Sequence, residues 1–271
     1  MDSVQTNHIK EANIMRKIVF FDIDGTLLDF DKALPISTKN AINQLKKNGV
    51  YVAIATGRAP FMFKELREQL DIDSYVCFNG QYVVFENEVI YKNPLNKESL
   101  HKLYEKTKES QIPLVFMNDQ CLKGTVSDSD HVRTTLATFG LEYPELSEKF
   151  YIENDVYQTL LYCTEQEEAT FEQEDGEVRF IRWHPVCTDV VPANGSKAAG
   201  IKKFIERAGF ELENVYAFGD GLNDIEMLQT VGTGIAMGNA EEELLKHADY
   251  VTTAVNEDGI YNGLVHVGLL K

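Results

Sequence analysis

Short, almost unbroken apolar runs alternate with amphipathic segments in the first eighty residues of the chain. The run at Lys17–Phe21 is typical of a strand buried on both faces of a parallel sheet. Similar strands are expected at Val50–Ala55 and Tyr75–Phe78, with helices near Thr38–Asn48 and Pro60–Leu70 between them. The order strand, helix, strand, helix, strand predicts a doubly wound, Rossmann-like parallel sheet of the α/β class.

After Asn79 and Gly80 the pattern changes to paired strands joined by short turns. A hairpin is expected at Gln81–Phe85 and Glu88–Tyr91. The other elements expected up to Trp183 are a helix at Asn96–Ser110, strands at Pro113–Met117 and Cys121–Val126, a helix at Asp130–Phe139, a strand at Val156–Cys163, an acidic helix at Thr164–Glu174 and a strand at Val178–Trp183. Such a mixture indicates an α+β insert rather than more parallel sheet.

The pattern of buried strands returns in the last third of the chain. The expected elements are a helix at Ser196–Gly209, a strand at Asn214–Gly219, a helix at Gly221–Gln229, a strand at Gly232–Met237, a segment at Ala240–His247 and a strand at Tyr250–Thr253. We therefore predict a catalytic core domain of residues 15–80 and 185–271 and an inserted cap of residues 81–184. The polar residues 1–14 are expected to form a disordered extension.

The charge of the chain argues against a nucleic-acid partner. Asp and Glu number 43 against 26 Lys and Arg, so the formal net charge is −17, and no run of basic residues is present. Nucleic-acid binding needs a basic face, because Lys and Arg neutralise the phosphates. No stretch approaches the ~18 apolar residues of a membrane span, so a membrane partner is not expected either.

The cysteines do not indicate a disulfide framework or a thiolate metal site. The four cysteines are widely spaced and form no C-x-x-C pair: Cys77, Cys121, Cys163 and Cys187. The N-terminus also lacks the apolar segment of a signal peptide. We expect a cytoplasmic protein with reduced, structural cysteines, present as a monomer or a weak dimer.

Two carboxylates follow the first strand directly, in the sequence Asp22-Ile-Asp24-Gly-Thr-Leu-Leu. A turn that starts here can aim both side chains at one site. One carboxylate is then suited to act as a nucleophile or metal ligand and the other to transfer protons. The alternative is a pair of aspartates that form the turn or cap a helix.

Two further motifs have the composition of anion-binding sites. Thr56-Gly57-Arg58 follows the second strand and offers a hydroxyl, an unhindered N–H and a guanidinium. Gly195-Ser196-Lys197 opens an amphipathic helix, whose positive end favours an anion. The alternatives are a helix cap with a surface Arg for the first motif and a solvated surface Lys for the second.

The fourth motif is Gly219-Asp220-Gly-Leu-Asn223-Asp224, after the strand that ends at Gly219. Three polar side chains within five residues, with two glycines, suit a cation bound by oxygen ligands, such as Mg²⁺. No His or Cys cluster accompanies them, which argues against zinc. An ordinary turn that caps the next helix is the alternative.

All four motifs lie at the carboxyl ends of core strands or at the start of a core helix, where open parallel sheets bind ligands. With these motifs in this order, the chain resembles the haloacid dehalogenase superfamily of phosphohydrolases. It is most similar to the Cof-type branch, which has a large α/β cap between the second and third motifs. The resemblance extends over essentially the whole chain from about Met15, and the motifs DIDGTLL, TGR, GSK and GDGLND are intact.

The resemblance implies a role for each carboxylate. Asp22 is the nucleophile that forms an aspartyl-phosphate. Asp24 protonates the leaving oxygen and then deprotonates the water that hydrolyses the intermediate. Mg²⁺ is held by Asp22, the backbone carbonyl of Asp24, and Asp220, with Asp224 near or behind it.

The resemblance also implies a set of phosphate-binding groups: Thr56, Gly57, Arg58, Lys197, the backbone N–H of Ile23 and the amide of Asn223. Asn79, with Gly80, is a candidate substrate contact or hinge. Trp183 and His184 are expected to have a structural role at the boundary of the cap rather than to face the substrate. His101 and His131 are expected on the surface or in packing contacts.

The implied function is a Mg²⁺-dependent phosphatase that acts on a small phosphorylated metabolite, such as a sugar phosphate, a cofactor phosphate or a nucleotide. There are two alternatives. One is a phosphotransferase or mutase, which shares the motifs and passes the phosphoryl group to a sugar hydroxyl. The other is a catalytically silent, metal-binding regulatory protein, which would be expected to have lost Asp22, Asp24 or Lys197.

Overall fold

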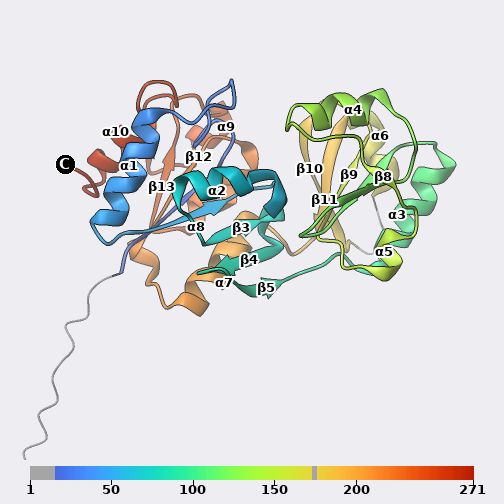
Figure 1. The fold of residues 1–271 in the computed structure, drawn as a ribbon, viewed down its shortest axis with the longest axis horizontal. Coiled ribbons are helices and arrows are strands. Elements are labelled where there is room, and N and C mark those ends of the chain that lie inside the picture. Colours follow the sequence, from blue (N-terminus) through green and yellow to red (C-terminus); the bar gives the residue numbers. More distant parts are fainter. Residues whose placement is uncertain (1–15, 173–175) are drawn as a thin grey trace, which may run out of the picture.

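The computed structural model describes residues 16–172 and 176–271 of the chain. It contains an eight-stranded sheet and a six-stranded sheet, which lie in separate lobes in Figure 1. The predicted extension of residues 1–14 lies outside the described residues. The architecture is a doubly wound α/β core with an inserted α+β cap, as the sequence pattern predicted.

The larger sheet forms the core, with the strand order β14-β13-β12-β1-β2-β3-β4-β5. Its strands are β1 (Ile18–Phe21), β2 (Tyr51–Ala55), β3 (Tyr75–Cys77), β4 (Tyr82–Phe85), β5 (Glu88–Lys92), β12 (Val215–Gly219), β13 (Thr233–Ala236) and β14 (Tyr250–Val251). The strands from β14 to β3 are parallel. Strands β4 and β5 extend one edge in antiparallel pairing.

Helices cover both faces of the core sheet. They are α1 (Ile36–Lys47), α2 (Lys64–Leu70), α7 (Lys197–Ala208), α8 (Ile225–Thr230), α9 (Glu242–Leu245) and α10 (Gly259–His266). Along β1, Val19 and Phe21 belong to the apolar cluster that contains α1, whereas Ile18 and Phe20 belong to the cluster that contains α7. Because both faces of β1 are buried, its sequence is an unbroken apolar run.

The smaller sheet has the strand order β10-β11-β9-β6-β7-β8. Its strands are β6 (Leu114–Met117), β7 (Leu122–Gly124), β8 (Glu145–Leu146), β9 (Gln158–Leu161), β10 (Val178–His184) and β11 (Cys187–Pro192), and its helices are α3 (Lys97–Glu109), α4 (Asp130–Ala137), α5 (Phe150–Glu153) and α6 (Glu165–Glu168). Leu114 and Phe116 of β6 pack in the cluster of α3, and Val115 and Met117 in that of α4. Strand β6, an inner strand of the cap sheet, is therefore buried on both faces.

The two sheets divide the chain at positions other than the expected boundaries at 80/81 and 184/185. The β4–β5 hairpin, expected to open the cap, pairs with β3 and lengthens the core sheet. Residues 187–192, expected in the core, form β11 between β10 and β9 of the cap sheet. Sequence periodicity indicates that a segment is a strand but not which strand it pairs with. Because β4 follows β3 within a few residues, it can pair with the free edge of β3.

Most of the predicted elements are present, with small shifts at their ends. The helix expected at Pro60–Leu70 is a 3-10 turn over Pro60–Phe63 followed by α2. The helix expected at Thr164–Glu174 is reduced to α6 and a 3-10 turn over Ala169–Phe171, and its end lies outside the described residues. The sequence pattern did not predict α5, α10, β8 or β11. Two of these are very short, and α10 contains two glycines, which lower helix propensity.

The two chain connections between core and cap are joined to each other. The side chain of Asn93, just after β5, donates hydrogen bonds to Gln81 Oε1 at 2.7 Å and to Asn194 Oδ1 at 3.0 Å. The backbone N–H of Asn93 also donates to the Gln81 carbonyl at 2.8 Å. Asn194 lies in the returning connection, between β11 and α7. The outgoing and returning segments therefore lie side by side.

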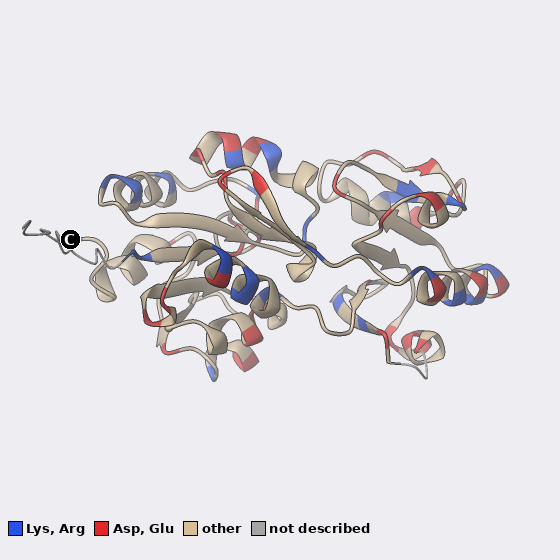
Figure 2. Ribbon diagram, turned by 90° about the horizontal axis from the view of Figure 1, so that it is seen from below, with Lys and Arg blue, Asp and Glu red and all other residues tan. Residues whose placement is uncertain are grey.

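Acidic and basic positions are interspersed along the outer helices in the view of Figure 2. Several of them form ion pairs, such as Lys102 with Glu98 within α3 at 3.1 Å, and Lys246, just after α9, with Glu243 at 2.5 Å. Within residues 16–172 and 176–271, no helix combines the length and the apolar character needed to cross a bilayer.

Gly80 fixes the chain direction where β3 ends beside the start of α7. Its φ is +100°, and a Cβ at this position would lie 1.9 Å from the carbonyl oxygen of Ser196. The preceding Asn79 also has a left-handed backbone, with φ 52° and ψ 36°. Only glycine tolerates both the backbone conformation and the close approach, and the turn places Asn79 next to the helix that carries Lys197.

We expect Gly80→Ala to lower the free energy of unfolding by more than about 2 kcal/mol, because backbone strain and steric overlap add. Gly49→Ala is the matched control, since Gly49 also has a positive φ, of +77°, but a Cβ there meets nothing within 4 Å. Denaturant unfolding, followed by circular dichroism, measures the free energy of unfolding of both variants. Equal losses in the two variants would contradict the steric argument.

Candidate active site

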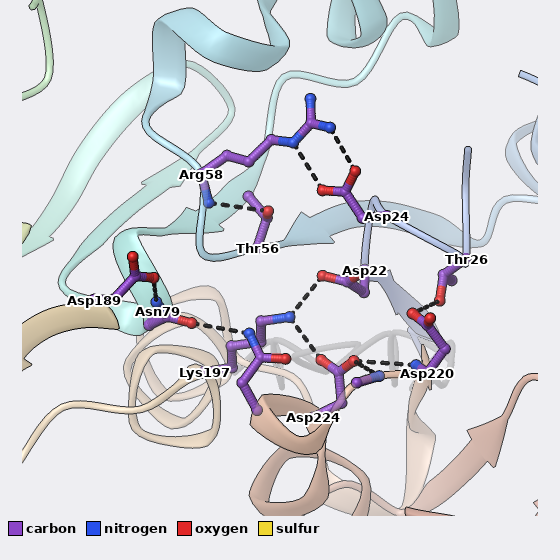
Figure 3. A network of polar contacts seen from close by, with 12 residues as sticks. Asp22, Asp24, Thr26, Thr56, Arg58, Asn79, Asp189, Lys197, Asp220 and Asp224 are labelled. Carbon is purple, nitrogen blue, oxygen red and sulfur yellow. Dashed lines mark hydrogen bonds and ion pairs between the residues drawn. The ribbon is translucent and has the colours of Figure 1, made fainter. Parts of the chain in front are cut away.

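A buried lysine holds two of the predicted carboxylates together (Figure 3). Lys197 Nζ donates to Asp22 Oδ1 and to Asp224 Oδ1, both at 2.6 Å. The Lys197 side chain is 1% exposed, and that of Asp224 is fully buried. The sequence separations are 175 and 27 residues, so the fold brings together the end of β1, the start of α7 and the loop after β12.

Lys197 is the first residue of α7, and its charge is unfavourable next to the helix dipole. Ser196 caps this helix by accepting a hydrogen bond from the N–H of Ala199. Burial lowers the pKa of Lys197, but the charges of Asp22 and Asp224 outweigh it, and the net pKa lies above its usual value. The ammonium is therefore charged and is compensated by carboxylates rather than by water.

The loop after β12 is shaped around Asp224. Its second oxygen, Oδ2, accepts hydrogen bonds from the backbone N–H groups of Asp220 and Gly221, each at 3.1 Å. Asp220 in turn accepts from the Thr26 hydroxyl at 3.1 Å. At Gly25, whose φ is +76°, a Cβ would lie 2.1 Å from Asp220 Oδ2, so glycine is needed for the loops after β1 and β12 to meet.

The three carboxylates of Asp22, Asp220 and Asp224 fit a divalent cation. One oxygen of each lies within 4.8 Å of the others. When all three are ionised, they leave, together with Lys197, an excess of two negative charges in a largely buried space. Burial raises the pKa of Asp22 to about 7 and that of Asp220 to about 8, and the neighbouring carboxylates add to both shifts. Oxygen ligands without His or Cys match Mg²⁺ rather than zinc.

Asp24 and Arg58 form a bidentate pair beside this cluster. Arg58 Nε donates to Asp24 Oδ2 at 2.8 Å and Arg58 Nη2 to Asp24 Oδ1 at 2.6 Å, and Lys32 Nζ donates to Oδ1 at 2.5 Å. Burial raises the pKa of Asp24, but the two cations outweigh it and leave the pKa below its usual value. Arg58, predicted as a phosphate ligand, is therefore engaged with Asp24.

Asn79 connects the core motifs to the cap. Its Nδ2 donates to Gln158 Oε1 at 3.0 Å and to Asp189 Oδ2 at 2.9 Å, and its Oδ1 accepts from Asn223 Nδ2 at 3.1 Å. Gln158 Nε2 also donates to the carbonyl of Gly57 at 3.1 Å. Because both N–H groups of Asn79 point to acceptors in the cap, its carbonyl oxygen is left to face Asn223.

A cavity of about 340 Å³ lies between the core and the cap and contains most of the predicted site residues. The predicted residues that line it are Asp22, Asp24, Thr56, Gly57, Arg58, Asp220 and Asn223. Three others are buried beneath or beside it: Lys197 and Asp224 in the carboxylate cluster, and Asn79 in the hydrogen bonds to the cap. Ile23 lies between the two aspartates, with its side chain in the apolar core.

Several lining residues were not predicted as site residues. Asp189, on β11, has a side chain that is nearly buried, and it accepts a hydrogen bond from Trp183 Nε1 at 2.8 Å. Trp183, expected to have a structural role at the boundary of the cap, also lines the cavity. The signal for Asp189 was a lone acidic residue inside an apolar strand, whereas Gln158 and Lys32 had no sequence signal of this kind.

His184 accepts a hydrogen bond from the backbone N–H of Val186 at 3.3 Å and does not line the cavity. His101 contacts Tyr151 through its ring nitrogen, and His131 is exposed on α4. These positions agree with the structural roles expected for all three histidines.

The comparisons with known proteins agree with this geometry. The sequence profile of a family described as haloacid dehalogenase-like hydrolase matches residues 19–264. The Bacillus subtilis protein YkrA, whose name places it among candidate phosphatases, is 47% identical over 255 residues, which are 94% of this chain and 99% of YkrA.

Two solved structures are similar over nearly the whole chain. A hypothetical protein from Geobacillus kaustophilus superposes with a TM-score of 0.88 at 53% identity, over 94% of this chain and 100% of that protein. BT4131, described as a sugar phosphatase of haloacid dehalogenase subclass IIB, superposes with a TM-score of 0.85 at 32% identity, again over 94% and 100% of the two chains.

The buried carboxylate of Asp189 predicts a pH dependence of stability. Burial raises its pKa to about 7, although the hydrogen bonds from Trp183 and Asn79 oppose this shift. In the unfolded chain the pKa of an Asp is about 4. The folded state holds the proton more tightly, so this residue's contribution to stability falls as the pH rises from about 4 to about 7 and is constant above that.

In Asp189→Asn this contribution is absent. We therefore expect the unfolding free energy of the parent minus that of the variant to decline with pH over the same window. Asp71→Asn is the control, because Lys46 lowers the pKa of the exposed Asp71 and the corresponding difference should not decline. Urea unfolding at a series of pH values, with chelator present, measures both. A difference for Asp189→Asn that does not vary with pH would contradict the prediction.

Proposed function

The chain belongs to the haloacid dehalogenase-like hydrolases, and we propose that it is a magnesium-dependent phosphatase that forms an aspartyl-phosphate on Asp22. Its relatives place it among the phosphoric monoester hydrolases. The observation that supports the proposed chemistry is the buried Lys197 at 2.6 Å from both Asp22 and Asp224, next to Asp220 at the edge of the cavity between core and cap.

Asp22 is placed to attack a phosphoryl group. Lys197 holds one carboxylate oxygen of Asp22, which leaves the other for attack on phosphorus as the ester bond to the leaving oxygen breaks. A phosphate dianion repels a carboxylate, and the Lys197 ammonium offsets part of that repulsion. Mg²⁺, when held by Asp22, Asp220 and the Asp24 carbonyl with Asp224 behind them, supplies the remaining positive charge.

Asp24 is the proposed acid and base. Paired with Arg58 and Lys32, its carboxylate is held in the ionised form, which suits the deprotonation of water in the second half of the reaction. To protonate the leaving oxygen in the first half, it must bind a proton and give up its bonds to Arg58. We therefore propose that Arg58 controls whether Asp24 is ionised or protonated. We propose that it also contributes positive charge to the site that binds the phosphoryl group.

Thr56, Gly57, Asn223 and the backbone N–H of Ile23 are the proposed ligands of the phosphoryl oxygens. Asn79 orients Asn223 through its hydrogen bond. The cavity volume of about 340 Å³ supports a small phosphorylated metabolite as substrate. We also propose a cytoplasmic location with reduced cysteines, which is consistent with the four unpaired thiols.

The proposal predicts phosphate release from para-nitrophenyl phosphate that requires Mg²⁺. Asp22→Asn should lower kcat by on the order of a thousandfold or more, because the nucleophile is lost. Asp71→Asn, at an exposed carboxylate far from the cavity, is the control for the substitution itself and should keep parental activity. Parental activity in Asp22→Asn would show that another residue is the nucleophile.

The same reaction distinguishes hydrolysis from transfer. With a sugar present as acceptor, a phosphatase releases inorganic phosphate in equal amount to the nitrophenol formed. A phosphotransferase or mutase instead leaves a deficit of inorganic phosphate that is recovered as sugar phosphate. We expect equal amounts, and a deficit would favour the transfer reaction.

A further inference from the structure

The cavity has two chemically different sides. The side formed by the core carries the carboxylates, the Thr56 hydroxyl, and the side chains of Lys32 and Arg58, the two cations that contact Asp24. The side formed by the cap is mainly apolar, with contributions from Met117, Leu136, Leu160, Phe139 and Trp183. If the phosphoryl group lies against Asp22, the leaving group of the substrate lies against the apolar side. The composition of that side then determines which leaving groups fit.

Two aromatic rings form a rigid part of this wall. Phe139 and Trp183 lie edge to face, with ring centroids 5.5 Å apart and an interplanar angle of 66°. The Trp183 ring is held by its Nε1–H bond to Asp189, and the residue lines the cavity and is 37% exposed. An exposed indole with a fixed orientation offers an apolar face on which a flat ring can stack.

Asp189 is the acidic residue on the cap side of the cavity. Of the other two polar lining residues of the cap, Thr138 donates its hydroxyl proton to the Thr135 carbonyl, and the Gln158 amide binds the core at both ends. Asp189 accepts one N–H on each oxygen, from Trp183 and from Asn79. A carboxylate has about four acceptor positions, so it can accept a further N–H or O–H from a ligand.

Cations line the cavity at one place only among the described residues. They are Lys32 and Arg58, and both contact Asp24, at 2.5 Å and 2.6 Å. Arg58 also lies over the Phe139 ring, 5.1 Å from its centroid. No described lysine or arginine of the cap lines the cavity. Because both cations are already paired with Asp24, a second anionic group on the leaving group would face the Asp189 carboxylate without an unpaired cation beside it. Like charges in such a partly desolvated space repel strongly.

We propose that Trp183, Phe139 and Asp189 form a leaving-group subsite for phosphate monoesters whose alcohol is uncharged or cationic, has a flat ring and donates a hydrogen bond, and that this subsite excludes leaving groups with a second anionic group. The proposal rests on the phosphatase function proposed above. Trp183 and Asp189 are its specificity-determining residues. They act on the choice of substrate, whereas Asp22 and Asp24 act on the phosphoryl transfer.

The ring preference is tested with two primary alkyl phosphates. Pyridoxine phosphate has a flat, hydrogen-bonding ring, and ribose 5-phosphate does not have an aromatic ring. We expect kcat/KM for pyridoxine phosphate to be higher by on the order of tenfold. Trp183→Ala should bring the ratio of the two values close to one. Ile152→Ala, at an exposed apolar residue of the cap that does not line the cavity, is the control and should keep the parental ratio.

The exclusion of a second anion is tested with sorbitol 6-phosphate and 6-phosphogluconate, two open-chain phosphates that differ by a carboxylate in place of a hydroxymethyl group. The assays are run well above the pKa of Asp189, which is about 7, so that its carboxylate is ionised. We expect the parent to prefer sorbitol 6-phosphate by about tenfold or more in kcat/KM. Asp189→Asn should reduce this preference, and Asp189→Glu, which keeps the charge, should retain it. If Asp189→Asn acted only by weakening the hydrogen bond to Asn79 and so displacing the site, kcat/KM would fall for both substrates together and their ratio would not change.

The outcomes separate the two proposals. Hydrolysis of para-nitrophenyl phosphate without a preference within either pair, or with ratios that Trp183→Ala and Asp189→Asn do not change, would overturn the leaving-group subsite and leave the phosphatase function intact. Absence of hydrolysis of every phosphate, with Mg²⁺ present, would overturn the phosphatase function itself.

Discussion

The ammonium of Lys197, buried between Asp22 and Asp224, is the interaction on which the rest of the site depends. It joins three segments that are far apart in sequence, and each carboxylate compensates for the cost of burying the charge. The parallel pairing of β1 with β12 brings the two aspartate loops to one edge of the sheet. The positive φ of Gly25 and the turn at Gly80 then allow the loops and the start of α7 to approach.

The chemistry of the site could be predicted from the sequence because its determinants are local. Each motif directly follows an apolar strand or opens an amphipathic helix, and parallel strands bring their carboxyl ends to the same edge. The partners of individual side chains could not be predicted in the same way. Arg58 had the composition of a phosphate ligand, but the fold places it 2.6 Å from Asp24. Its partner depends on how the loops after β1 and β2 meet, and periodicity does not contain that information.

The same limit explains the errors in the cap. The strand pattern of the β4–β5 hairpin was predicted, but a hairpin pattern is compatible with either sheet. Strand β11 was missed, and with it Asp189, because a short apolar segment after a turn does not reveal its neighbours. Asp189 contacts Trp183 within the cap and Asn79 in the core, so its importance is visible only when both sheets are in place.

The pairing of the two core–cap connections restricts how the lobes can move. Asn93 bonds to Gln81 beside the outgoing segment and to Asn194 in the returning one, so the two connections lie next to each other. A body attached to another by two adjacent tethers can rotate about the line through them without stretching either, whereas sliding or twisting would strain both. The connections therefore favour rotation about a single axis. Such a rotation would break the hydrogen bonds that join Asn79 and Gly57 of the core to Gln158 and Asp189 of the cap. It would leave in place the contacts of Lys197 with Asp22 and Asp224, which lie entirely in the core.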